Sequence, residues 1–258
     1  MAKPTVVDEI TEQLACRIAA GDYLPGDLLP SVRQVAAEFG ASTPIANSAL
    51  GRLAALGFAE PRRGLGYTVR DIRLYGGIDT WRFVFRFAHR IPNRATEIFA
   101  DIIDVDHMLV VQAIRTLAAD PRSYDTTQSG QALDRFELLV DEGAELAEIM
   151  SAELHLLRCL FSALGHPGFL SLFNTVGEVL IAVPEAGQAV YGPIEPEGHL
   201  ALARRLHTLW QSGTELAAPE LDGLEMLLRT YHDQVVETFR ELIRRSAVSE
   251  EGVRAPTG

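Results

Sequence analysis

Cysteine is scarce in this sequence, with only Cys16 and Cys159 among 258 residues, each within a stretch of helical periodicity. This scarcity argues against a disulfide framework and predicts a reducing compartment. Long hydrophobic runs are also missing, since no stretch approaches the ~20 apolar residues that a membrane-spanning helix needs. The N-terminus shows no basic segment followed by an apolar one, so no secretory signal is predicted. These absences together predict a cytoplasmic chain without a membrane partner.

Positive charge is in short supply as well, because 23 Lys and Arg stand against 35 Asp and Glu, a net charge of −12. Such a balance argues at first against a nucleic-acid partner. The charges are unevenly distributed, however, and residues 31–70 carry five Arg against two Glu. A local basic region is what a contact with a phosphate backbone requires. Hydrophobic residues make up 47% of the chain, enough for one large or two modest domains.

The N-terminal region predicts two short helices after a first helix over residues 5–20. Ser31 and Gln34 have the spacing of a capping box, in which each side chain satisfies a backbone N–H of the other residue. Gly40 is suited to the left-handed position that ends this second helix. Ser42 or Thr43 is expected to cap a third helix, with Pro44 at its first position.

Two short strands are predicted next, over residues 58–63 and 66–70, joined by a basic loop that contains glycine. The order of capped helix, glycine turn, capped helix and basic hairpin is typical of a winged helix-turn-helix, which places its last helix in the major groove of DNA. Short polar side chains at that helix N-terminus reach base edges or phosphates, and arginines of the wing reach phosphates or the minor groove. The predicted DNA contacts are Arg33, Ser42, Thr43, Pro44, Asn47, Ser48, Arg52, Arg62, Arg63 and Gly64. Two alternatives remain open: surface arginines that are merely solvated, and a winged helix used only for protein contact.

The predicted fold is mainly α. A winged helix-turn-helix with a small β-wing occupies residues 1–71, a linker follows at 72–78, and an antiparallel bundle of about seven helices occupies 79–246. A flexible tail is expected at 247–258. The bundle helices are predicted at 79–91, 95–118, 127–141, 144–164, 168–183, 196–212 and 219–245.

The N-terminal stretch resembles the GntR family of bacterial regulators. The matching residues are Leu29, Pro30, Ser31, Arg33, Ala36, Gly40, Leu50, Leu53, Gly57, Gly64 and Gly66. The resemblance implies that Arg33, the start of the third helix and the wing contact an operator. The family often carries arginines early in the recognition helix, where this chain has Ser42-Thr43-Pro44-Ile45-Ala46-Asn47, so fewer charged contacts and weaker or less salt-dependent binding are expected.

The helical region resembles the FadR subfamily, best over residues 152–167 and as far as Asn174, with His166 in place of the usual Asn. Most members hold a metal through an Asp four residues before a His, plus two later histidines. His155, His199 and His232 lie on three predicted helices in that order and are the candidate ligands for Zn or Ni. Ser151 stands where the Asp is expected, and Glu148 is a weak replacement.

The alternative is that these three histidines are metal-free polar groups of a pocket, as in the fatty-acyl-CoA-responsive branch of the subfamily. An acyl chain would then lie among aliphatic and aromatic side chains. The candidate effector-pocket residues are Arg115, His155, Arg158, Tyr191, His199, Trp210, Arg229, Tyr231 and His232.

No motif for catalysis is found: there is no nucleophile elbow, dinucleotide fingerprint, P-loop or Cys-x-x-Cys. The predicted protein is a homodimeric regulator that binds a palindromic operator, and a repressor is favoured over an activator. A small effector such as an acyl-CoA is expected to release it from the operator. One alternative is a regulator that senses an organic carboxylate through a His-bound metal. A second is a metal-dependent helical enzyme with an accessory winged helix.

Overall fold

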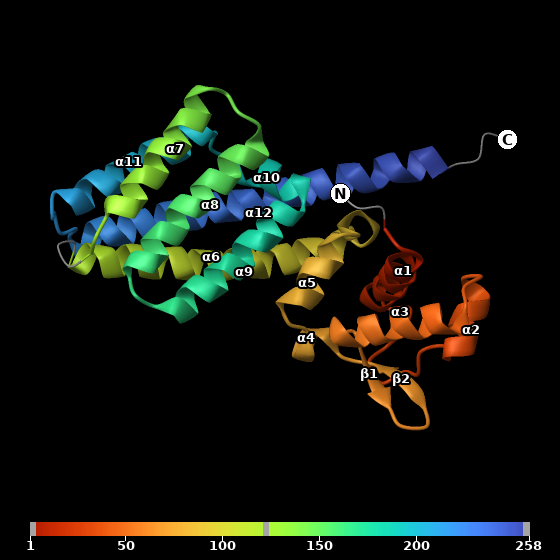
Figure 1. Ribbon diagram of the computed structural model, residues 1–258. Coiled ribbons are helices and arrows are strands. Elements are labelled where there is room, and N and C mark those ends of the chain that lie inside the picture. Colours follow the sequence, from red (N-terminus) through yellow and green to blue (C-terminus); the bar gives the residue numbers. More distant parts are fainter. Residues whose placement is uncertain (1–3, 121–123, 255–258) are drawn as a thin grey trace. The chain divides into compact units, whose positions relative to one another are not determined.

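The computed structural model describes residues 4–120 and 124–254. The chain divides into two compact units, Met1–Ala95 and Thr96–Gly258 (Figure 1). The prediction of a mainly helical chain with a small two-stranded sheet is confirmed.

The first unit contains helices and one antiparallel hairpin. Its elements are α1 (Val6–Ala20), α2 (Val32–Glu38), α3 (Thr43–Ala55), β1 (Ala59–Arg62), β2 (Gly66–Val69), α4 (Ile72–Tyr75), α5 (Ile78–Phe85) and the 3-10 helix η1 (Ala88–Arg90).

Local capping signals set the helix starts in this unit. The predicted box at Ser31 is present, because the Ser31 N–H donates to Gln34 Oε1 at 2.9 Å and the Gln34 N–H donates to Ser31 Oγ at 3.4 Å. Gly40 follows α2 with a φ of 59°, as predicted. Ser42 is the N-cap of α3 but makes no side-chain capping bond, and Pro44 occupies the second helical position rather than the predicted first.

The core of the first unit lies where α1, α2 and α3 meet. Leu14, Val35, Leu50 and Leu53 are fully buried there, each on the apolar stripe of its helix. Phe58, just before β1, is also fully buried. These side chains hold α3 with its opposite face free for other contacts.

The predicted linker at 72–78 lies inside this unit. Ile72 of α4 is buried, and Thr80 of α5 donates a 2.7 Å hydrogen bond to the Leu56 carbonyl. The ring of Phe83 also meets that of Phe58 edge-on at 6.1 Å. The first unit therefore extends to Ala95 because α4 and α5 pack on the helix-turn-helix core.

The second unit is a bundle of long helices. Its elements are α6 (Pro92–Ala119, which begins in the first unit), α7 (Thr127–Asp141), α8 (Leu146–Ala163), α9 (Pro167–Ala182), α10 (Pro184–Val190), α11 (Pro196–Gln211) and α12 (Ala218–Arg254).

The helix assignments differ from the sequence prediction in three places. The predicted helix 79–91 is α5 followed by η1, and both belong to the first unit. The predicted break at 184–198 contains the short helix α10, which Pro184 begins and which buries Ala186 and Ala189. Residues 247–254 of the predicted flexible tail continue α12, and the part beyond Arg254 lies outside the described residues.

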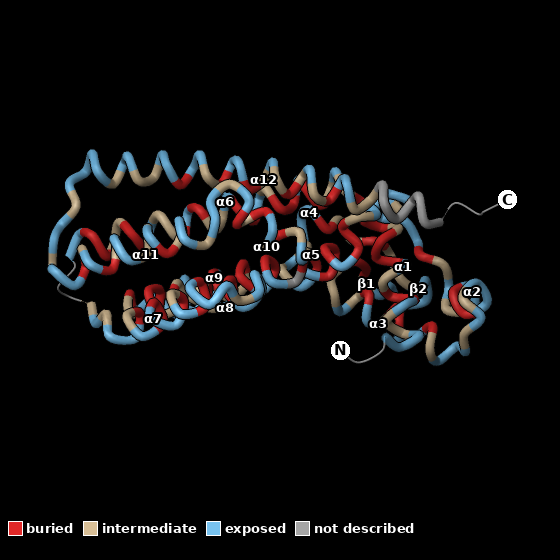
Figure 2. Tube along the Cα trace, turned by 90° about the horizontal axis from the view of Figure 1, so that it is seen from above, coloured by how far each residue is buried: buried red, intermediate tan, exposed pale blue. Residues whose placement is uncertain are grey.

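Stacked aromatic pairs connect neighbouring helices of the bundle. Phe99 of α6 stacks on Phe239 of α12 at 3.9 Å between ring centroids, and Phe161 of α8 stacks on Phe173 of α9 at 4.6 Å. Helices α7 and α8 run side by side, and the buried positions form the inward faces of the helices (Figure 2). Among the described residues no single helix is long and apolar enough to span a membrane; only α9 and α10 taken together reach that composition, across a bend of 106°.

Candidate nucleic-acid interface and effector cavity

The first turns of α3 present a polar, exposed surface. Ala46 and Ala49 are buried against the core, whereas Thr43, Asn47 and Ser48 are exposed. Thr43 and Asn47 are four residues apart and therefore lie on one face of the helix. Short hydroxyl and amide groups on an exposed helix N-terminus can contact both base edges and phosphates. Ser42 and Pro44 are exposed at the same end of α3.

The wing is the hairpin between β1 and β2, whose register pairs Ala59 with Val69 and Arg62 with Gly66. Gly64 and Gly66 have φ values of 77° and 105°, a left-handed conformation that favours glycine. The turn exposes Arg63, for which no ion-pair partner occurs in the described part of the chain. Arg62 is exposed too but pairs with Glu60. Arg63 is therefore the wing cation that is free to meet a phosphate.

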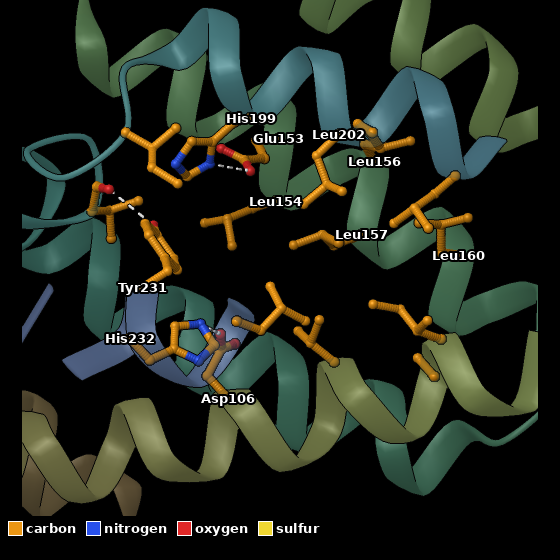
Figure 3. Close-up of a pocket in the computed structure, with 18 of the residues that line it drawn as sticks. Asp106, Glu153, Leu154, Leu156, Leu157, Leu160, His199, Leu202, Tyr231 and His232 are labelled. Carbon is orange, nitrogen blue, oxygen red and sulfur yellow. Dashed lines mark hydrogen bonds and ion pairs between the residues drawn. The ribbon is translucent and has the colours of Figure 1, made fainter. Parts of the chain in front are cut away.

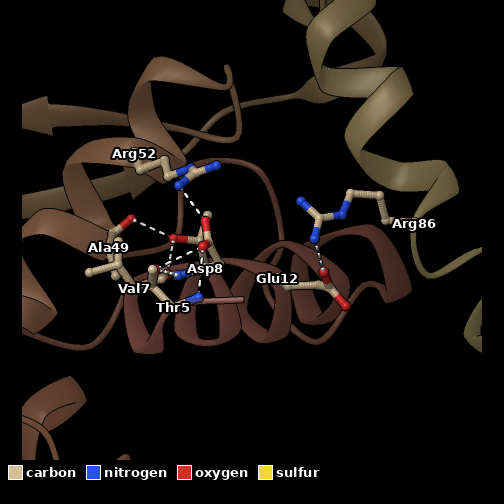
Figure 4. A network of polar contacts seen from close by, with 8 residues as sticks. Thr5, Val7, Asp8, Glu12, Ala49, Arg52 and Arg86 are labelled. Carbon is tan, nitrogen blue, oxygen red and sulfur yellow. Dashed lines mark hydrogen bonds and ion pairs between the residues drawn. The ribbon is translucent and has the colours of Figure 1, made fainter. Parts of the chain in front are cut away.

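Arg52 has a different position from the other predicted DNA contacts. Its guanidinium pairs with Asp8 of α1, and Asp8 also accepts hydrogen bonds from Thr5, which lower the pKa of its carboxyl (Figure 4). Thr11 Oγ1 donates to the Val7 carbonyl at 2.7 Å and lies 3.4 Å from that of Ala49. These contacts connect α1 to α3. Arg52 therefore helps to position the recognition helix through its contact with α1.

Arg33 is the remaining predicted contact. It is exposed on α2, and the described residues supply it with no ion-pair partner. Arg33 and Arg63 are thus exposed cations without an ion-pair partner in the described chain, whereas Arg70 after β2 lies over the ring of Tyr75, 4.9 Å from its centroid.

The second unit encloses a cavity of about 190 Å³. A single water needs about 10–15 Å³ by this measure, so the space can hold a small organic molecule. Its wall is mainly aliphatic and comes from α6, α8, α9, α10, α11 and α12, with Ile194 from the segment between α10 and α11. Figure 3 shows Leu156 and Leu160 toward one end and His199, Tyr231 and His232 toward the other.

Glu153 of α8 organises one side of the polar end. Tyr191 Oη donates to Glu153 Oε2 at 2.6 Å, and His199 Nδ1 lies 2.8 Å from Oε1. The Tyr231 hydroxyl donates to the Val190 carbonyl at 2.9 Å. The rings of Tyr191, His199 and Tyr231 follow one another at centroid distances of 4.9 and 5.3 Å.

The other side of the polar end is formed by α6 and α12. His232 Nδ1 lies 3.0 Å from His107 Nδ1, and His232 Nε2 lies 3.8 Å from Asp106 Oδ2. Burial raises the pKa of Asp106 to about 7, with the charge of Glu153 adding to the rise. Burial also lowers the pKa of His232 to about 4, with His107 contributing. At neutral pH His232 is uncharged, and the Asp106 carboxyl is near the midpoint of its titration.

The predicted pocket residues divide into two groups. His199, Trp210, Tyr231 and His232 line the cavity, and Tyr191 supports its edge through Glu153. Three predicted arginines are engaged elsewhere: Arg115 with Asp222 and Glu225, Arg158 with Asn174, and Arg229 with Asp104. None of the three is among the lining residues.

The predicted metal set does not fit this arrangement. His155 is exposed on α8, where its Nε2 lies 3.8 Å from Cys159 Sγ, while His199 and His232 face the cavity. Within residues 4–120 and 124–254, no group of three or more His, Cys, Asp or Glu side chains is arranged to hold a metal ion. The reason is helical phase: Glu153, Leu154 and Leu156 of this turn line the cavity, and His155 lies on the exposed face of α8.

Asp106, His107 and Glu153 are site residues that the sequence analysis did not single out. A signal existed for two of them, because Asp106 and Glu153 interrupt otherwise apolar helix faces. Their pairing with groups on α11 and α12 depends on contacts between helices, which the sequence pattern does not show.

Comparison with known proteins agrees with the geometry of the first unit. Residues 6–69 match the model described as "Bacterial regulatory proteins, gntR family". The first unit therefore contains a helix-turn-helix domain of the GntR family, a class of DNA-binding transcription regulators.

Two curated relatives match the chain over 87 residues at 40% identity: the HTH-type transcriptional regulator Mce2R of Mycobacterium tuberculosis and the uncharacterized HTH-type transcriptional regulator Mb0601 of Mycobacterium bovis. The match covers 33% of this chain and spans 36% of each relative's length. A solved structure of Lar, which controls expression of the Listeria monocytogenes agr system, superposes with a TM-score of 0.51 at 15% identity. It covers 96% of this chain and 99% of that one, which shows a similar fold.

Proposed function

We propose that this protein is a homodimeric transcription regulator of the FadR type. It binds a palindromic operator, and a small effector releases it from the DNA. This mode of action is that of a repressor. The observation that carries the proposal is the pairing of an exposed recognition helix and basic wing with a ligand-sized cavity in the same chain. One unit supplies the DNA contact, and the other supplies a site through which a small molecule can act.

Charge supports this division of roles. Residues 1–95 carry 12 Lys and Arg against 9 Asp and Glu, whereas residues 96–258 carry 11 against 26. DNA repels an acidic surface and attracts a basic one, so the chain should approach an operator through its first unit. Two copies related by a two-fold axis would present two recognition helices to the half-sites of a palindrome.

The effector would act by preferring one conformation of the regulator. A ligand shifts an equilibrium only by its difference in affinity for the two states, and a difference of about 1–3 kcal/mol changes DNA affinity about 5- to 150-fold. The cavity wall favours a ligand with an apolar body. The acyl chain of an acyl-CoA suits that wall, whereas the lining residues include no Lys or Arg for its phosphates.

One alternative effector predicted from the sequence is an organic carboxylate that would bind through a metal held by histidines. The positions of His155, His199 and His232 give it no support. The metal-dependent enzyme considered from the sequence would need an open metal position with a general base beside it. We propose no catalytic role.

The proposal is tested by operator binding at several salt concentrations. Arg63→Ala should weaken binding several-fold and reduce the slope of log affinity against log salt by about 1, because it removes one phosphate contact. Arg62→Ala should have a smaller effect, since Arg62 already pairs with Glu60. Arg205→Ala, which changes an exposed arginine of α11, is the matched control and should leave binding unchanged.

Two results would contradict the proposal. One is the absence of a protected palindrome together with salt-independent binding. The other is an equal loss of affinity in the Arg63 and Arg205 variants, because the contact would then not be specific to the wing.

A further inference from the structure

His199 places an unpaired ring nitrogen at the cavity. Its Nδ1 lies 2.8 Å from Glu153 Oε1, and with Nδ1 donating to that oxygen the neutral ring leaves a lone pair on Nε2. Nε2 is buried and has no hydrogen-bond partner in the described part of the chain, and the side chain is only 10% exposed. A buried acceptor without a donor is unfavourable, so a ligand that donates a hydrogen bond to it is favoured.

The neighbouring hydroxyl groups cannot supply that donor. The Tyr191 proton is directed to Glu153, and the Tyr231 proton is directed to the Val190 carbonyl. Each of these bonds is short enough to hold its hydroxyl in place, at 2.6 and 2.9 Å. The edge formed by His199, Tyr191 and Tyr231 therefore offers acceptors to a ligand, whereas Trp210, further along α11, has a buried indole N–H without a partner in the described chain.

The charges at the cavity have one sign. Asp106 and Glu153 are both lining residues, and no lysine or arginine is among the residues that line the space. A ligand carboxylate or phosphate would be buried beside two carboxyl groups without a counter-charge, which is strongly disfavoured. A cationic head group would instead be stabilised by both acidic side chains.

We propose, on the basis of the regulatory function above, that the effector cavity takes an aliphatic amine. Its head group donates to His199 Nε2 and lies near Asp106 and Glu153. Its hydrocarbon body lies against the aliphatic wall, which includes Leu154 and Leu157. The raised pKa of Asp106 supports this placement, because a bound cation compensates the charge that burial disfavours.

Binding of a matched octyl series to the full-length protein tests the proposal. Trp210 lines the cavity and is 4% exposed, so its emission reports a ligand there, and Trp81→Phe removes the other tryptophan. Octylamine should bind at neutral pH about tenfold or more tighter than octanoate, with octanol between them. Octanoate binding as tightly as octylamine, octanol binding tighter than octylamine, or no octyl compound binding would each overturn the proposal.

A substitution at Glu153 links the preference to the geometry. Glu153→Gln removes one negative charge and lets an amide N–H donate to His199 Nδ1, which moves the ring proton to Nε2. Octylamine affinity should fall about tenfold and octanoate affinity should rise. Glu148→Gln, an exposed position on the same helix, is the matched control and should leave the order unchanged. An unchanged order in the Glu153 variant would overturn the role given to His199.

Operator release, measured separately, distinguishes the two proposals. Octylamine that binds without releasing DNA supports the ligand class and contradicts the regulatory function. Octanoate that binds and releases DNA supports the regulatory function and contradicts the ligand class.

Discussion

The two units place their polar chemistry on opposite sides of their cores. In the first unit Thr43, Asn47 and Ser48 are exposed outside a packed interior, and Arg33 and Arg63 are exposed in the same unit. In the second unit Asp106 and Glu153 face inward, at the edge of a hollow interior. A surface that meets a large polyanion needs exposed groups, whereas a site for a small molecule needs groups that water cannot reach.

The largest expected effect comes from the buried acid of the second unit. The pKa of Asp106 rises from 3.8 to about 7 on folding, so the unfolded chain ionises first as pH increases. The free energy of unfolding therefore falls between about pH 4 and pH 7 because of this group. Asp106→Asn removes that fall, and the stability of the variant relative to the wild type should rise across this window by up to about 4 kcal/mol.

Urea unfolding at a series of pH values measures this difference. The pKa of His232 falls from 6.5 to about 4 and gives the opposite slope, but it does so in both proteins and largely cancels. Asp101→Asn, an exposed position on the same helix, should give a flat difference. A flat difference for Asp106→Asn would mean that its carboxyl is solvated.

A second test compares the packed interior with the hollow one. Leu50 of α3 is fully buried in the first unit, and Leu50→Ala should cost about 3 kcal/mol. Leu157→Ala at the cavity wall should cost less, about 1–2 kcal/mol, because that side chain already lacks neighbours on one side. Trp81 and Trp210 report unfolding of the first and second units, and equal costs would indicate that the cavity is closed in solution.

The smallest expected effect concerns a helix cap on the outer surface. Ser31→Ala removes the capping box of α2 and should cost about 1 kcal/mol. Ser42→Ala is the matched control, because the Ser42 hydroxyl makes no capping bond, and it should cost a few tenths of a kcal/mol at most. Thermal unfolding followed at Trp81 measures both, and similar shifts would remove the distinction between the two caps.

The sequence predicted the first unit well because its signals are local. The box at Ser31, the left-handed Gly40 and the glycine-containing wing are each set by neighbours within a few residues. The extent of the unit was not predicted, because the bond from Thr80 to Leu56 spans 24 residues. The linker predicted at 72–78 instead contains α4 and the start of α5, which pack on the core.

The cavity was predicted only in part. His199, Tyr231 and His232 were candidates and line it, but His155 was chosen by its order along the chain and lies exposed. The partners of His199, Tyr231 and His232 come from α8, α10 and α6, up to 125 residues away in sequence. Such pairings depend on how the helices pack. Hydrophobic periodicity shows which face of a helix is buried but does not show which residues of two helices lie opposite each other.

The ion pair between Arg52 and Asp8 has a consequence for how this protein can evolve. Arg52 ties α3 to α1, and the exposed Thr43, Asn47 and Ser48 make no side-chain hydrogen bond within the described chain. Their replacement removes no internal side-chain hydrogen bond, and we expect it to leave the fold intact. Operator preference can drift by single substitutions at these positions while the scaffold stays constant, and a library randomised there should consist mainly of folded proteins.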